Sequence, residues 1–254
     1  MSIIGIVSMK GGVGKTSVTV NLASALATKL GRGRVSVVDL DPQNALHLHL
    51  GIDNPQMLGV CEQSLLGGDW REAAFSSDFN VVCMPYGTPS ERERKAFEVL
   101  LAKTPEWVGN QIEQTGLGND AVVLIDTPPG ASVYLKQVFA CADIILVVVL
   151  ADAGSYATIP AMEVWLDDML ASYPQLRNFY VLNQIDRSES LNRDVADKLL
   201  RDLGSRLAPV GIHSDEAVCE ALAFMRPVLA YDPHGQASHD HSRLATWLID
   251  TLNR

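Results

Sequence analysis

The chain has 254 residues, 47% of them hydrophobic, and a formal net charge of −10 at pH 7. This length allows one α/β domain or two small ones, and the charge argues against a protein that binds nucleic acid through its phosphates, which needs a basic face. The four cysteines are widely spaced without a C-x-x-C pair, which indicates reduced thiols rather than a disulfide framework or a zinc site.

Short β-branched apolar runs alternate with helical patterns along the whole chain. The expected strands cover residues 3–7, 35–40, 81–84, 122–125, 144–150 and 179–182. The expected helices cover residues 16–30, 91–115, 131–141, 155–172, 189–203, 215–224 and 239–252. Because the strands are apolar on both faces and alternate with helices, they predict an α/β fold with a doubly wound, mainly parallel sheet flanked by helices. No linker rich in Pro, Gly or Ser divides the chain, so we expect a single domain over residues 1–254.

The first expected strand leads into a glycine loop, residues 8–17, with the sequence Ser-Met-Lys-Gly-Gly-Val-Gly-Lys-Thr-Ser. Backbone N–H groups of such a loop, together with the dipole of the helix that follows, bind phosphate. The usual pattern is G-x-x-x-x-G-K-[ST], but here Met9 takes the first glycine position and a second lysine, Lys10, follows it. The alternative is a glycine turn that only connects strand to helix.

Within this loop the pattern assigns each position an expected contact. The residues expected to bind the nucleotide phosphates are Gly11, Gly12, Val13, Gly14, Lys15, Thr16 and Ser17. Lys15 occupies the position that reaches the β- and γ-phosphates, and Thr16 the position whose hydroxyl ligates Mg²⁺.

The second expected strand is followed by Asp39-Leu40-Asp41-Pro42-Gln43-Asn44. Alternation places Asp39 and Asp41 on the same side as the chain leaves the sheet. A carboxylate there can orient a water for attack on a γ-phosphate or hold Mg²⁺ through a water. The alternative is a helix N-cap, because Asp-Pro also begins helices.

Two later strands also end in polar residues. The strand at 122–125 is followed by Asp126, the Walker B arrangement that places a carboxylate beside the metal, and then by a stiff Pro-Pro-Gly turn able to sense the γ-phosphate. The strand at 179–182 is followed by Asn183, whose amide can donate to and accept from an adenine edge. For Asn183 the alternative is a capping or turn residue.

No segment predicts insertion into a membrane. The longest apolar run, residues 144–150, is far shorter than a bilayer span, and the first residues lack the layout of a signal peptide, so we expect a cytoplasmic protein. The terminal helix is amphipathic through Leu244, Trp247, Leu248 and Leu252 but has few basic residues. This composition favours a helix docked on the core over a membrane-binding tail.

These four polar segments occur in the order and rough spacing of the ParA/MinD ATPases, whose deviant Walker A loop the segment at residues 8–17 resembles. The resemblance covers nearly the whole chain and implies a P-loop NTPase that binds ATP and Mg²⁺, forms a face-to-face homodimer with ATP, and hydrolyses it slowly as a switch. It implies catalytic roles for Lys10, Lys15 and Asp41: Lys10 reaches the partner's nucleotide and Asp41 positions the attacking water. Asp39 and Asp126, with Thr16, would then lie at the metal.

Two further stretches, residues 58–72 and 212–231, resemble the BcsQ ATPases encoded with bacterial cellulose synthase. That resemblance implies a protein that assists assembly, localisation or activity of the cellulose synthase machinery through protein partners. It implies no nucleic-acid partner, indirect membrane association at most, and recruitment to the inner membrane or cell pole through partners. The alternatives are a chromosome or plasmid partition ATPase, a MinD-type positioning ATPase, and a scaffold that dimerises with ATP without hydrolysing it. A basic patch or a membrane-binding tail would mark the first two.

Overall fold

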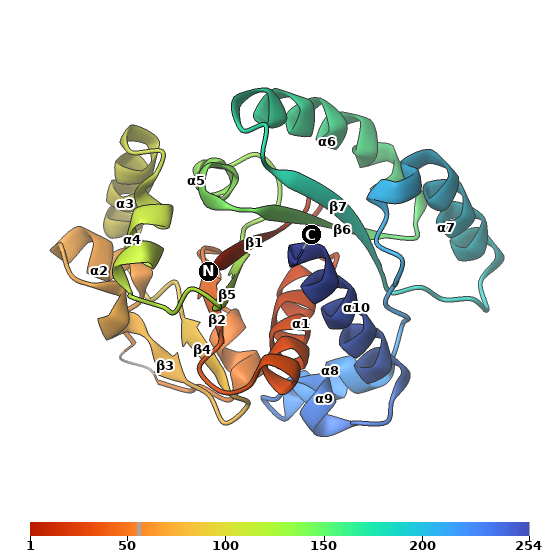
Figure 1. The fold of residues 1–254 in the computed structure, drawn as a ribbon, viewed down its shortest axis with the longest axis horizontal. Helices are drawn as coiled ribbons and strands as arrows, with labels where there is room; N and C mark the ends of the chain where they lie inside the picture. Colours follow the sequence, from red (N-terminus) through yellow and green to blue (C-terminus); the bar gives the residue numbers. More distant parts are fainter. Residues whose placement is uncertain (55–56, 254) are drawn as a thin grey trace.

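The computed structural model describes residues 1–54 and 57–253, and its centre is a seven-stranded sheet (Figure 1). The strands are β1 (Ser2–Val7), β2 (Val35–Asp39), β3 (Phe75–Ser76), β4 (Val81–Met84), β5 (Val122–Asp126), β6 (Ile144–Leu150) and β7 (Arg177–Asn183). Their order is β3-β4-β2-β5-β1-β6-β7, and every neighbouring pair is parallel except β3 with β4. The predicted doubly wound, mainly parallel sheet is therefore confirmed.

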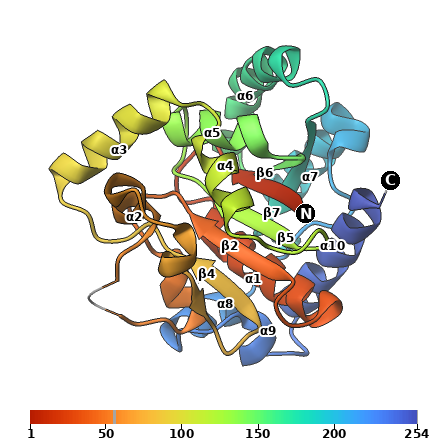
Figure 2. The same cartoon turned by 60° about the vertical axis from the view of Figure 1, so that its left-hand side comes forward.

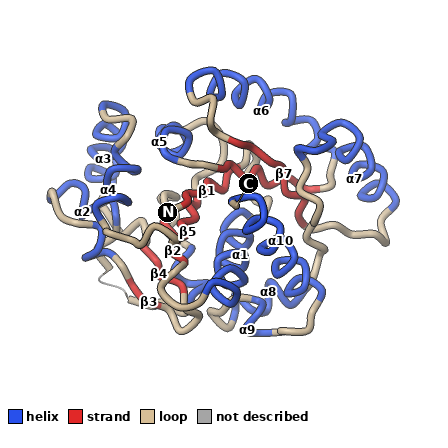
Figure 3. The backbone as a smooth tube through the Cα atoms, in the orientation of Figure 1, coloured by secondary structure: helices blue, strands red, loops and turns tan. Residues whose placement is uncertain are grey.

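Helices cover both faces of this sheet. They are α1 (Lys15–Leu30), α2 (Val60–Leu66), α3 (Glu91–Lys103), α4 (Trp107–Gln114), α5 (Val133–Cys141), α6 (Ala153–Ser172), α7 (Ser190–Leu203), α8 (Glu216–Ala223), α9 (Val228–Tyr231) and α10 (Gln236–Leu252). α1 and α10 lie side by side on one face, and α3 to α7 cover the other (Figures 1 and 2). Figure 3 shows the strands in red between these two layers of blue helices.

The two faces of each strand belong to two different cores. In β1, Ile3 and Val7 pack into the core beneath α3 to α7, whereas Ile4 and Ile6 pack into the core shared with α1 and α10. All four are buried. Burial on both faces explains why the strand sequences are apolar without alternation.

One predicted helix was wrong in its extent. The sequence predicted a continuous helix over residues 91–115, but α3 ends at Lys103 and α4 begins at Trp107. Pro105 explains the break, because its ring disfavours helical geometry at the preceding residue; Thr104 has φ −130° and ψ 85°. The prediction also omitted α2, β3, α9 and three short 3₁₀ segments, Leu46–Leu50, Trp70–Ala73 and Gly204–Arg206.

The C-terminal helix is part of the core, as predicted. Leu244 and Leu248 of α10 are fully buried against α1, and Trp247 packs edge-on against Phe179 of β7 with ring centroids 5.0 Å apart. Arg177 donates to the carbonyl of Thr251 near the helix end. Within residues 1–54 and 57–253, no helix is both long and apolar enough to cross a membrane.

Candidate functional site

The glycine loop joins the end of β1 to the start of α1. Gly12 and Gly14 have φ values of 75° and 81°, the left-handed region that favours glycine. Gly14 is also the N-cap of α1 and supplies no side-chain cap, whereas Ser90, Ser132 and Asp152 cap α3, α5 and α6. The first N–H groups of α1 are therefore directed at a position where an anion can bind.

Asn183 lies against this loop from the end of β7. Its amide nitrogen donates to the carbonyl of Val13 at 2.8 Å, and its side chain is 6% exposed. A Cβ on Gly14 would lie 2.6 Å from the same nitrogen, and the φ of 81° at this position also favours glycine, so glycine permits this close approach. The structure thus brings Asn183 to the loop. One N–H of its amide donates to the loop and is not directed toward an adenine edge.

A hydroxyl–carboxylate cluster lies behind the start of α1. The Thr16 hydroxyl donates to Asp126 Oδ2 at 2.6 Å, and the Thr19 hydroxyl contacts Asp126 Oδ1 at 3.3 Å. Lys15 is 7% exposed, and its charge offsets part of the rise in the pKa of Asp126 that burial causes. Sequence reasoning missed Thr19; its position three residues after Thr16, on the same helix face, is the signal that points to it.

Asp39 and Asp126 lie directly opposite each other on β2 and β5, and both are fully buried. Burial, followed by the charge of Asp126, raises the pKa of Asp39 well above its usual range. Burial also raises the pKa of Asp126 to about 6, although Lys15 and the Thr16 hydroxyl partly offset the effect. Two buried carboxylates on directly opposed positions of neighbouring strands favour a cation between or beside them.

The donor set fits Mg²⁺ that is also held by a nucleotide. Thr16, Asp39 and Asp126 offer the oxygen ligands that Mg²⁺ prefers. Across the described parts of the chain, no group of three or more His, Cys, Asp or Glu side chains is arranged to hold a metal ion alone. Mg²⁺ commonly binds through one or two protein oxygens plus substrate phosphates, which suits this arrangement.

Asp41 lies just beyond the sheet edge, half-buried. Its backbone N–H donates to Asp39 Oδ1 at 2.9 Å, and its own Oδ1 accepts the Gln43 N–H at 2.9 Å. The next helical residue is Leu46, whose N–H donates to Asp39 Oδ2 at 3.2 Å. Asp41 therefore forms a turn and is not a helix N-cap, and Asp39 fixes the chain on both sides of it.

Lys10 is bound by its own chain in this structure. Its Nζ lies 3.0 Å from Asp152 Oδ2, and the two side chains are 41% and 39% exposed. Asp152 caps α6 through its other oxygen, which accepts the Ser155 N–H. Sequence reasoning missed Asp152, although an acidic residue just after a buried strand is the same signal that identified Asp39 and Asp126.

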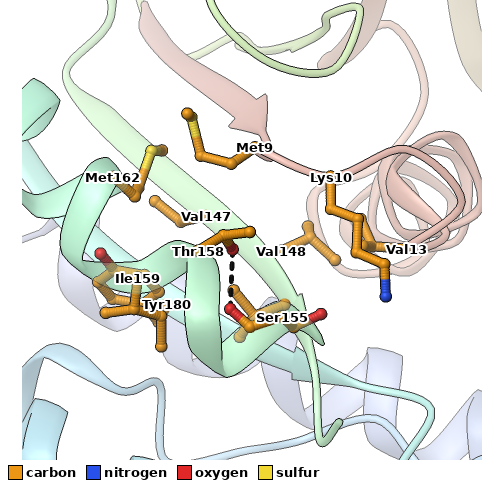
Figure 4. Close-up of a pocket in the computed structure, with 11 residues that line it drawn as sticks. Met9, Lys10, Val13, Val147, Val148, Ser155, Thr158, Ile159, Met162 and Tyr180 are labelled. Carbon is orange, nitrogen blue, oxygen red and sulfur yellow. Dashed lines mark hydrogen bonds between the residues drawn. The ribbon is translucent and has the colours of Figure 1, made fainter. Parts of the chain in front are cut away.

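Figure 4 shows the contact region between this lysine and α6. Met9, Lys10 and Val13 lie beside Ser155, Thr158, Ile159 and Met162 around a cavity of about 10 Å³. The Ser155 hydroxyl is buried and has no hydrogen-bond partner among the described residues. A space of this size holds about one water molecule.

A cleft of about 200 Å³ adjoins the start of α1. It is lined by Gly14, Ser17, Val18, Asn183, Gln184, Ile212, His213, Ser214, Asp215, Val218, Cys219 and His241. Because Gly14 and Ser17 belong to both the loop and the cleft, a nucleotide with its phosphates at the loop has space here for its base. Burial lowers the pKa of His241 to about 4, so its ring is neutral near pH 7. Apart from Gly14, Ser17 and Asn183, none of these lining residues was predicted to belong to the site. Residues 212–215 were missed because they follow no predicted strand.

The fold and the relatives define the chain as a P-loop ATPase of the ParA/MinD type. It is 27% identical to the septum site-determining protein MinD of Pyrococcus horikoshii OT3, solved in complex with Mg-ADP, with a TM-score of 0.79; the match covers 99% of this chain and 97% of that one. It is also 27% identical over 256 residues to the chromosome partitioning protein ParA of Caulobacter vibrioides (strain NA1000 / CB15N), covering 98% of this chain and 94% of the relative.

Within that class the family is also shown. The sequence profile described as "Cellulose biosynthesis protein BcsQ" matches residues 1–249, so the chain belongs to the BcsQ family of cellulose biosynthesis proteins. The BcsQ protein of Salmonella typhimurium LT2 is 28% identical over 250 residues, which cover 98% of this chain and 94% of that protein. The resemblance inferred from residues 58–72 and 212–231 is thereby confirmed.

Proposed function

We propose that this protein is an ATP-dependent dimerising ATPase that acts as a switch in the bacterial cellulose synthase machinery, and that residues 1–254 form a single domain. The observation that carries the proposal is the uncapped start of α1, next to Lys15 and to the buried cluster of Thr16, Asp126 and Asp39. A helix start open to an anion and a carboxylate pair that favours a cation are complementary halves of an ATP–Mg²⁺ site. That one sheet contains strands from residues 2 to 183 supports the single domain.

In this proposal each part of the site has a separate task. Backbone N–H groups of residues 11–17 bind the phosphates, and Lys15 neutralises charge at the β- and γ-phosphates. Thr16, Asp126 and Asp39 would hold Mg²⁺, which would supply charge neutralisation at the phosphates. Asn183 keeps Val13 and Gly14 in place and borders the cleft for the base.

Asp41 is the proposed residue that orients the attacking water. It is half-buried beyond the carboxylate pair, and Asp39 fixes its backbone while its Oδ2 remains available to a water. We expect Asp41→Ala to lower γ-phosphate release by about 10²-fold or more, the usual scale for general-base and water-positioning groups. The control is Asp250→Ala, an exposed aspartate of α10. Equal rates for wild type and Asp41→Ala would remove Asp41 from the mechanism.

Lys10 is the proposed trans-acting cation. In the isolated chain it pairs with Asp152, and in a face-to-face dimer it would exchange this partner for the γ-phosphate of the other subunit. Hydrolysis then requires the dimer, so turnover is slow and acts as a timer.

Membership of the BcsQ family supports a role in cellulose biosynthesis. We propose that the protein fulfils this role through protein partners, without nucleic acid and with indirect membrane recruitment at most. A partition or positioning ATPase is the second candidate, because the identity to ParA and MinD relatives, 27% each, nearly equals the 28% to BcsQ. Deleting the gene and measuring cellulose output and chromosome segregation in the same strain separates the two. A segregation defect with normal cellulose output would favour the second candidate.

A further inference from the structure

A groove of about 570 Å³ is lined by residues of α7 and by residues 207–211. Figure 1 shows α7 at the edge of the molecule, beside β7. Residues 207–213 follow β7 in parallel, with the Ala208 N–H donating to Tyr180 and the Ile212 N–H donating to Leu182. The apolar side chains that line the groove are Leu182, Ile185, Ala196, Leu200, Leu207, Ala208 and Pro209. No residue of the nucleotide loop lines it.

One residue of helix α7 leaves a large apolar side chain outside the packing on the sheet. Leu199 and Leu203 are buried in the core beneath the helix, and Ala196 also packs against that core. Leu200 lines the groove beside Ala196 and is 58% exposed. An apolar groove of this size with an exposed leucine at its edge is typical of a surface that binds another chain.

The charges at the groove select the kind of partner. Its charged lining residues are Arg187, Arg193 and Asp197. Among the described residues, Arg187 has no ion-pair partner, and Arg193 donates only to the backbone carbonyls of Arg187 and Ser188. The groove thus carries an excess positive charge within a protein of net charge −10. Carboxylates of a partner complement two guanidinium groups in this position.

We propose that this groove binds an amphipathic helical segment of a protein partner, with apolar side chains against Leu200 and Leu207 and carboxylates against Arg187 and Arg193. A helix laid in a groove uses this combination of an apolar floor and a charged rim. Two arginines beside one aspartate are too few cations for a nucleic-acid backbone or an anionic membrane, each of which calls for a larger basic face.

The test uses overlapping synthetic peptides that tile the proteins encoded beside this gene, followed by fluorescence titration of those that bind. We expect the bound peptides to be acidic and amphipathic with helical periodicity. Arg187→Glu and Leu200→Asp should each weaken binding about tenfold or more. The matched controls are Arg201→Glu and Leu191→Asp, exposed residues of the same helix that do not line the groove, and they should change affinity less than about twofold.

Several results would overturn this proposal: no peptide binds, the bound peptides are basic, or the controls lose as much affinity as the groove variants. A parallel titration with vesicles containing anionic lipid covers the other class of partner. Vesicle binding abolished by both groove variants would assign the surface to a membrane instead.

Circular dichroism and nucleotide binding of each variant show that it is folded. The groove is outside the proposed ATP site, so failure of this test leaves the ATPase proposal intact, and loss of the ATPase proposal leaves this one testable.

Discussion

The buried pair of Asp39 and Asp126 makes the properties of this protein depend on pH. The pKa of Asp126 is about 6 in the folded protein against an ordinary value of 3.8, so between these values the folded state binds more protons than the unfolded state. For the ligand-free protein, the contribution of Asp126 to the free energy of unfolding is therefore largest below pH 4 and falls as the pH rises through 6. Asp39 adds to this trend in the same direction.

Metal binding should show the opposite trend, because Mg²⁺ requires the ionised carboxylate. Because burial raises the pKa of Asp126 to about 6, a smaller fraction of the Asp126 side chains is ionised at pH 5.5 than at pH 7.5. We expect the Kd for Mg²⁺·ADP, measured by calorimetry, to be severalfold higher at pH 5.5 than at pH 7.5. The control is Asp126→Asn, which should lose this part of the pH dependence; the same dependence in both proteins would contradict the assignment.

The pairing of Lys10 with Asp152 predicts that freeing the lysine favours the dimer. Asp152→Asn removes the charge but keeps an oxygen for the Ser155 N–H. Exposed ion pairs contribute about 0.2–1 kcal/mol, so the dimer dissociation constant with a slowly hydrolysed ATP analogue should fall up to about fivefold. Sedimentation equilibrium measures this, with Asp120→Asn, which breaks an exposed pair with Arg34, as the control. A weaker dimer in Asp152→Asn would contradict the idea that Asp152 competes for Lys10.

The residues that sequence alone located are those at strand ends. Asp39 and Asp126 could be placed together because the carboxyl ends of parallel strands meet at one edge of the sheet. The bond from Asn183 to Val13 and the pairing of Lys10 with Asp152 could not, because each depends on how two segments more than a hundred residues apart are oriented.

At the scale of elements, the strands were predictable because their apolar runs are buried on both faces. The break at Pro105 was missed because the apolar residues of α3 and α4 recur at the same helical spacing, so the pattern continues across the proline. The short α2 was missed because its N-cap is Gly59 and its first-turn residue Glu62 accepts N–H groups of Gly59 and Thr88, contacts that only the folded chain makes.

Because α10 packs against α1, we expect the C-terminal helix to contribute to the stability of the hydrophobic core. Leu248→Ala removes a fully buried side chain and should lower the free energy of unfolding by about 2–5 kcal/mol. Urea denaturation measures the loss. Thr246→Ala, on the exposed face of the same helix, should change it by about 0.5 kcal/mol or less. Equal stability of the two variants would show that α10 does not contribute to the core.

For the whole molecule, the proposed switch predicts an oligomeric state set by nucleotide. Gel filtration should show a monomer with ADP and a dimer with a slowly hydrolysed ATP analogue, because only the γ-phosphate offers Lys10 a partner across the interface. Lys10→Ala should remain monomeric under both conditions, and Lys29→Ala, an exposed lysine of α1, should behave as wild type. A dimer that forms with either nucleotide would contradict the proposed switch.

Residues 182–185 border two different spaces. Leu182 and Ile185 line the groove beside α7, and Asn183 and Gln184 line the cleft beside Gly14. A shift of this segment that improved one contact would change the other, so a partner in the groove and a nucleotide in the cleft would influence each other's affinity. Thermodynamic reciprocity requires the two effects to be the same factor: a partner that tightens nucleotide binding tenfold, about 1.4 kcal/mol, is itself held ten times more tightly once nucleotide is bound.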